Sequence, residues 1–129
     1  MVRRRFAGER LHLTVEGATL ERLLAEAGSA VCELLAAGPA GGRPDRLPVQ
    51  IRARDPERLL AGFLDDLLQL AHAEDFRATR IERLEVDETG LRAAVSGRTA
   101  AGDTPVPRVI ARTLTARGGP WRAEIELEP

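Results

Sequence analysis

The chain switches between two hydrophobic periods, one typical of strands and the other of helices. Leu11-His12-Leu13-Thr14-Val15 has an apolar residue at every second position, which predicts a strand with one buried face. Gly17 interrupts this pattern, and Thr19 can cap the helix that follows. That helix carries one apolar stripe and ends near residue 37. The stripe consists of Leu20, Leu23, Leu24, Ala27, Val31, Leu34 and Leu35.

A glycine- and proline-rich stretch over residues 38–44 predicts a loop, and the alternation over residues 49–53 predicts a second strand. Asp55-Pro56-Glu57 is typical of a helix start, because Asp caps, Pro suits the first turn and Glu suits the positive end. The stripe of this second helix consists of Leu59, Leu60, Phe63, Leu64, Leu67, Leu68 and Ala71.

From residue 76 onward the period is two. Residues 76–86 fit a strand with one slip or bulge, Glu88-Thr89-Gly90 predicts a hairpin turn, and residues 91–97 pair back. A loop over residues 99–104 precedes a strand over residues 106–116. Pro105 and Pro107 restrict that strand to a sheet edge or to late entry into pairing. Residues 121–128 alternate again and form the last strand.

The predicted order is β-α-β-α-β-β-β-β, an α+β protein in which two helices pack on one face of a largely antiparallel sheet. The 129 residues, 43% of them apolar, favour a single domain over residues 1–129. The formal net charge of -1 excludes a general electrostatic polyanion binder. Cys32 has no intramolecular partner for a disulfide, and no apolar run reaches the roughly 18 residues of a membrane span, so we expect a cytoplasmic protein that does not enter the membrane.

Catalytic motifs are sparse. All 19 basic residues are arginine, so a lysine-based mechanism is excluded. The sequence has no glycine-rich phosphate loop and no paired-cysteine zinc pattern. Cys32 lies within the apolar stripe of the first helix and is expected to be a buried, inert side chain. His72 suits the negative end of the second helix, whereas His12 remains open as a pocket residue.

Charged residues alternate near the C-terminal end of the sequence. Glu124, Glu126 and Glu128 share one face of the last strand. A solvated face crossed by arginines is the favoured interpretation for Glu124 and Glu126, whereas a solvated face and a cation site both stay open for Glu128. On the preceding strand, Arg108, Arg112 and Arg117 could contact an RNA phosphate or a protein carboxylate. Four aromatic residues are too few for a base-stacking platform, so direct nucleic-acid binding is not expected.

Three segments together resemble the archease family. V-E-G-A-T-L-E-R-L-L over residues 15–24 is similar to its strand-to-helix segment, and F-L-D-D-L-L over residues 63–68 is similar to its second helix. W-R-A-E-I-E-L-E-P over residues 121–129 is similar to its terminal strand, which closes with an acid one position before the last. Length and element order agree over nearly the whole chain.

This resemblance implies a non-enzymatic accessory protein that acts with the GTP-dependent RNA ligase of tRNA splicing and RNA repair. It also implies a metal site, usually described with calcium. The site takes one acid from a motif before the first strand, one from the loop after the first helix and one from the C-terminus. Oxygen ligands of this kind suit hard cations.

The residues at these positions depart from the family pattern. The Asp-His-Thr-Ala-Asp motif falls on Phe6-Ala7-Gly8-Glu9-Arg10, so both aspartates are absent. The loop acid falls near residues 37–38, and the nearest acid there is Asp45. Glu128 matches the terminal acid, and the family lysine falls on Pro107 or Arg108. Arginine in place of an acid inverts the charge of the metal site, so no cofactor is expected. Glu9, Asp45 and Glu128 are the remaining acids that could form a substitute metal site.

We therefore expect a partner-binding face with Arg10 within salt-bridge reach of Glu128; its other members are Glu9, His12, Arg108 and Arg112. The expected partner is an RNA ligase of the tRNA-splicing type. One alternative is a paralogue that kept the fold and became a protein-interaction module, with homo-oligomers forming through a sheet edge. The least supported alternative is an independent enzyme.

Overall fold

Seven strands and two helices make up the part of the chain that the computed structural model describes, which is residues 1–36, 42–99, 106–116 and 119–128. In chain order they are β1 (Val2–Ala7), β2 (Arg10–Gly17), α1 (Leu20–Ala36), β3 (Arg43–Ile51), α2 (Pro56–Ala73), β4 (Phe76–Asp87), β5 (Gly90–Thr99), β6 (Arg108–Thr115) and β7 (Trp121–Glu128). All strand pairs are antiparallel. The α+β class and the predicted run of helices and strands are confirmed, with one strand added at the start.

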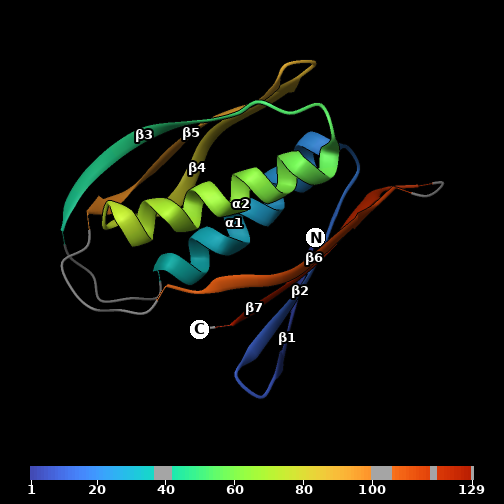
Figure 1. Ribbon diagram of the computed structural model, residues 1–129, viewed down its shortest axis with the longest axis horizontal. Helices are drawn as coiled ribbons and strands as arrows, with labels where there is room; N and C mark the ends of the chain where they lie inside the picture. Colours follow the sequence, from blue (N-terminus) through green and yellow to red (C-terminus); the bar gives the residue numbers. More distant parts are fainter. Residues whose placement is uncertain (37–41, 100–105, 117–118, 129) are drawn as a thin grey trace.

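The strands form two sheets rather than one, with the helices between them (Figure 1). One sheet has the order β1-β2-β7-β6 and the other the order β3-β5-β4. Helix α1 packs on β4 from one sheet and on β2 from the other, and α2 likewise touches β3, β4 and β6. The apolar stripe of each helix is wide enough to contact both sheets, so each helix is buried between two layers of strands.

The added strand is β1, which covers the arginine run of residues 3–5. It pairs with β2 from Val2 opposite Val15 to Ala7 opposite Arg10, which leaves the two-residue turn Gly8-Glu9. Gly8 has a φ of 66°, the left-handed region that a glycine adopts without strain at the first position of such a turn. The turn residue therefore fixes a hairpin that hydrophobic alternation does not reveal.

Both helix starts agree with the sequence. The hydroxyl of Thr19 accepts a hydrogen bond from the main-chain N–H of Arg22 (3.1 Å), and the carboxylate of Asp55 accepts one from Glu57 (3.2 Å). These bonds satisfy main-chain donors that have no partner inside the helix. The capping residues thus set where α1 and α2 begin.

Prolines and register shifts interrupt the strands at three of the sheet edges. Strand β3 begins at Arg43, earlier than the predicted loop allowed, and it tolerates Pro44 and Pro48 because it is an edge strand. Strand β6 lies at the edge of the other sheet, as its prolines predicted. Strand β4 has two register shifts against β5, where the sequence predicted one.

The core fills the two spaces between the helices and the sheets. Its largest fully buried side chains include Phe63, Leu13, Leu91 and Ile125, which come from both sheets and from α2. The helices approach closely at Gly28, where a Cβ atom would lie 2.5 Å from the Phe63 ring. In the described part of the chain, neither helix has the length and hydrophobicity to cross a lipid bilayer.

Candidate functional site

The predicted partner-binding residues lie mostly on one surface, the outer side of the four-stranded sheet. Strands β2, β7 and β6 are neighbours in that sheet, so the side chains that they direct outward lie side by side. Leu11, Leu13 and Val15 point inward, so the intervening side chains of β2 point out. We call this surface the outer charged face, and it comprises Arg3, Arg5, Arg10, His12, Thr14, Glu16, Arg108, Arg122, Glu124, Glu126 and Glu128.

His12 lies between two carboxylates at the centre of the outer charged face. Its Nε2 atom is 3.7 Å from the carboxylate of Glu124, and its Nδ1 atom is 3.5 Å from that of Glu126. Strand pairing explains this position, because β2 places His12 directly opposite Glu126. The imidazole is half-buried, so protonated His12 would neutralise part of the acidic row on β7.

Arg108 neutralises the last glutamate of that row. Arg108 on β6 lies directly opposite Glu128 on β7, and its guanidinium donates a hydrogen bond to the Glu128 carboxylate. The expected Arg10–Glu128 pair is absent from the ion pairs of the described residues, and Glu128 pairs with Arg108 instead. Arg10 belongs to the same face, and Glu9 is exposed in the β1–β2 turn.

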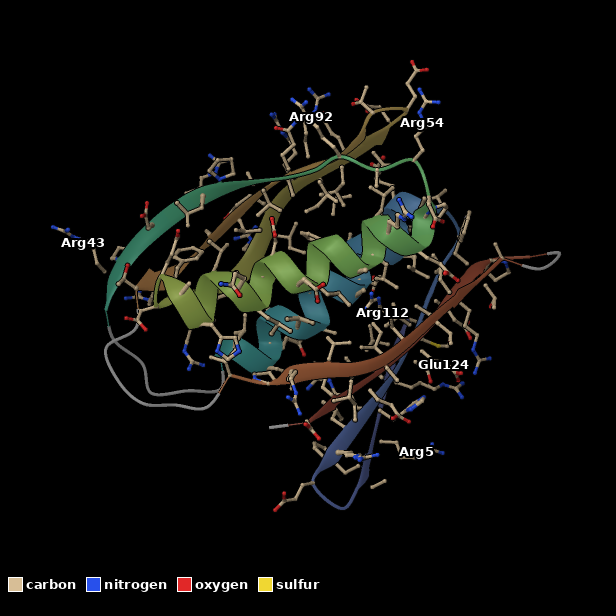
Figure 2. All side chains as sticks on the ribbon, in the orientation of Figure 1. Arg5, Arg43, Arg54, Arg92, Arg112 and Glu124 are labelled. Carbon is tan, nitrogen blue, oxygen red and sulfur yellow. The ribbon has the colours of Figure 1, made fainter. Side chains whose placement is uncertain are left out.

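Arg112 lies on the opposite side of the sheet from Arg108. A register shift between Val109 and Ala111 reverses the alternation of β6, so Arg112 pairs with the buried Ile125 and points toward α2. Figure 2 shows Arg112 in the space between β6 and α2, with Arg5 and Glu124 across the sheet. Arg112 lines a groove of about 410 Å³ with Asp55, Glu57, Arg58 and Leu60 at the start of α2.

The substitute metal set does not come together. Asp45 lies on β3 in the other sheet, Glu9 is in the β1–β2 turn, and Glu128 is held by Arg108. The position of the family's loop acid, residues 37–38, and Arg117 fall outside the described residues. Within the described residues, no three His, Cys, Asp or Glu side chains gather as metal ligands do. The described donors therefore do not fit a calcium ion.

Three titratable groups outside this face have shifted pKa values. Burial raises the pKa of Cys32 to about 12, which agrees with the inert role expected for it. Burial, helped by neighbouring Asp65, raises the pKa of Asp66, which lines a hollow beside β3. Hydrogen bonds from Thr89 lower the pKa of Asp87 at the end of β4.

Sequence reasoning missed two features. Arg77 is buried on β4, where its guanidinium reaches the Leu35 carbonyl at the end of α1 (3.4 Å). Nothing in the sequence distinguishes this arginine from the exposed Arg80 and Arg83 on the same strand. The second feature is the exposed edge of β1 with Phe6, which is 71% exposed. The Gly8-Glu9 turn signal could have located that edge.

These features define a small α+β protein that carries charged sheet surfaces and, in its described part, no nucleophile paired with a base. The model of the Archease protein family (MTH1598/TM1083) matches residues 11–111. The chain therefore belongs to the archease family, and the match begins directly after the altered motif at residues 6–10.

A solved structure shares the fold. It is the solution structure of Methanobacterium thermoautotrophicum protein 1598, 17% identical, with a TM-score of 0.59 over 99% of this chain and 98% of that one. A search of the curated proteins gave no match.

Proposed function

We propose that this chain is a non-enzymatic accessory protein that binds an RNA ligase of the tRNA-splicing type and supports its repeated turnover. Membership of the archease family carries this proposal. The residues of the outer charged face are exposed or half-buried and carry both charges. They favour contact with a protein surface, because opposite charges on such a face give specificity and steer association.

We further propose that this support requires no calcium. The family site would need carboxylates where this chain has Phe6 and Arg10, and its remaining acid, Glu128, is paired with Arg108. A guanidinium can neutralise a carboxylate without a metal and can also contact phosphate. Arg108 thus supplies positive charge at the position where other family members are described as holding a cation.

The altered site also favours a second candidate, an archease-fold module that no longer activates a ligase and binds another protein. Both candidates are binding proteins, and they differ in whether the ligase responds.

Guanylylation and multiple-turnover RNA joining by the ligase of the same organism test the proposal, with and without this protein and with calcium or a chelator. We expect stimulation that is unchanged by the chelator and lost in Arg108→Glu. Arg46→Glu, an equal charge change on the other sheet, should stimulate like the wild type. Absence of both stimulation and complex formation would support the second candidate, and stimulation that needs calcium would overturn the metal-free proposal.

A further inference from the structure

The two sheets have four edges, and three of them are blocked against pairing with another strand. Strand β3 contains Pro44 and Pro48, and β6 follows Pro107 and has a register shift. Strand β4 has two register shifts, and its Val86 N–H donates to the Glu21 carboxylate (3.4 Å). Prolines and bulges protect an exposed edge by removing or displacing its main-chain donors, and charged side chains protect it by repelling like charges. The fourth edge, β1, has no proline and no bulge and pairs with β2 without a register shift, and its arginines repel only strands of like charge.

The hydrogen-bonding pattern shows which main-chain groups of β1 are open. Met1 and Glu16 exchange two hydrogen bonds of 2.8 Å each, so the odd-numbered residues of β1 bond to β2. The N–H and C=O groups of Val2, Arg4 and Phe6 then point away from β2, toward the free edge. These groups form a regular row of donors and acceptors for one more strand.

The two sides of this edge differ in charge. Arg3 and Arg5 point to the outer charged face, and neither forms an ion pair with any residue that the structure describes. On the helix side, Val2 and Arg4 line a groove of about 270 Å³ whose other wall belongs to α1 and includes Glu26, Ala30 and Glu33. Arg4 is paired with Glu33 across this groove.

These charges decide what can pair with β1. A second copy of β1 would place arginines opposite arginines, because residues 3–5 are all arginine, and like charges opposite each other destabilise a sheet. An acidic side chain fits beside Arg3 and Arg5. On the helix side, Glu26 and Glu33 disfavour an acid, and the small groove beside Ala30 suits a small apolar side chain.

We infer that the free edge of β1 binds an extended segment of a protein partner by strand addition. The segment carries acidic residues at alternate positions and small apolar residues between them. Phe6, at the end of the strand, supplies exposed apolar area for the same contact. This inference does not depend on the ligase being the partner, because the edge recognises a sequence pattern.

A peptide of alternating glutamate and valine tests the inference, with a peptide of alternating lysine and valine as the matched control. In an NMR titration of the full chain to about 1 mM peptide, the amides of Val2, Arg4 and Phe6 should shift most. The amides of Arg3 and Arg5 already bond to β2 and should shift less. The lysine peptide should leave β1 unchanged.

Variants separate side-chain recognition from main-chain pairing. Arg3→Glu with Arg5→Glu should weaken binding about tenfold or more, whereas Arg46→Glu with Arg54→Glu makes the same charge change elsewhere and should not. Phe6→Pro removes one open N–H and should weaken binding more than Phe6→Ala, which keeps it. Circular dichroism should show all of these variants folded, since Phe6 and the four arginines are exposed.

Several results would overturn the inference. Equal binding of both peptides, or no shift along β1, would exclude an acidic strand as the occupant. Single-stranded oligouridine that displaces the peptide at lower concentration would assign the edge to nucleic acid. A wild-type dimer that Phe6→Pro converts to a monomer would assign it to a second copy of the chain.

Discussion

The guanidinium of Arg77, on β4, donates a hydrogen bond to the main-chain carbonyl of Leu35 in the last turn of α1 (3.4 Å). The last carbonyls of a helix have no partner inside it, and a cation is favourable at this negative end. Arg77 is 9% exposed, so its charge is held against the helix rather than in water. This contact ties the three-stranded sheet to α1.

We expect Arg77→Ala to lower the free energy of unfolding by about 2 kcal/mol, because it leaves the helix end without this cation and removes a buried side chain. Arg80→Ala, on the same strand with a 76% exposed side chain, should change it by less than about 0.5 kcal/mol. Urea unfolding measures both. Equal effects of the two substitutions would contradict a specific role for Arg77.

Gly28→Ala should destabilise the protein by about 1–2 kcal/mol, although alanine is the better helix former. The new Cβ atom would lie 2.5 Å from both the Phe63 ring and Ile81, and Phe63 is fully buried. Ser29→Ala, at the exposed neighbouring position, should be neutral or slightly stabilising. Thermal unfolding compares the two, and a stabilised Gly28→Ala would show that α1 and α2 can separate without cost.

Cys32 should control the alkaline limit of stability. Its pKa is raised from 9.0 to about 12 in the folded state, so the folded protein disfavours the thiolate. The stability that the protein gains by burying the neutral thiol is fully present below pH 9 and is lost as the pH rises from 9 to 12. The chain has no lysine and no tyrosine, so no other ordinary side chain titrates in that window.

Urea midpoints measured from pH 8 to 11.5 should fall for the wild type and stay nearly level for Cys32→Ala. The alanine variant will be less stable at pH 8, so the comparison rests on the slope with pH. If the urea midpoints of the wild type and of Cys32→Ala fell in parallel with rising pH, the loss of stability at alkaline pH would have another origin. Under native conditions a thiol reagent should also modify Cys32 far more slowly than in urea.

Calcium should leave the melting temperature of the wild type unchanged, since a ligand stabilises only a protein that binds it. The variant Phe6→Asp, Arg10→Asp, Arg108→Ala restores two family acids and releases Glu128. We expect its melting temperature to rise with calcium. Differential scanning fluorimetry with calcium and with a chelator compares them, and a calcium response of the wild type would refute the proposed loss of the site.

Hydrophobic period and capping residues predicted the helices because the signals act locally. Thr19 and Asp55 bond within three residues of themselves, so their roles do not depend on the rest of the fold. Strand β1 escaped prediction because Arg3, Arg4 and Arg5 show no alternation. Its pairing is fixed by the turn at Gly8 and by β2.

The candidate face was predictable as far as the alternation of each strand holds. His12, Arg108 and Glu128 lie on one face because β2, β7 and β6 are neighbours in the sheet. Arg112 was misplaced because one extra residue in β6 reverses the side chains that follow it, and such a bulge leaves no mark in the sequence. The division into two sheets was also missed, since a wide apolar stripe does not say how many layers cover it.

The pairing of β2 with β7 has a consequence for synthesis and folding. Leu11 lies opposite Leu127, so six elements are made between the two central strands of that sheet. Until β7 leaves the ribosome, β2 and β6 have no strand between them and that sheet stays open at its centre, while the β3-β5-β4 layer can already assemble on the helices. A nascent chain stopped before Trp121 should therefore be a chaperone substrate, although most of its core residues are already present.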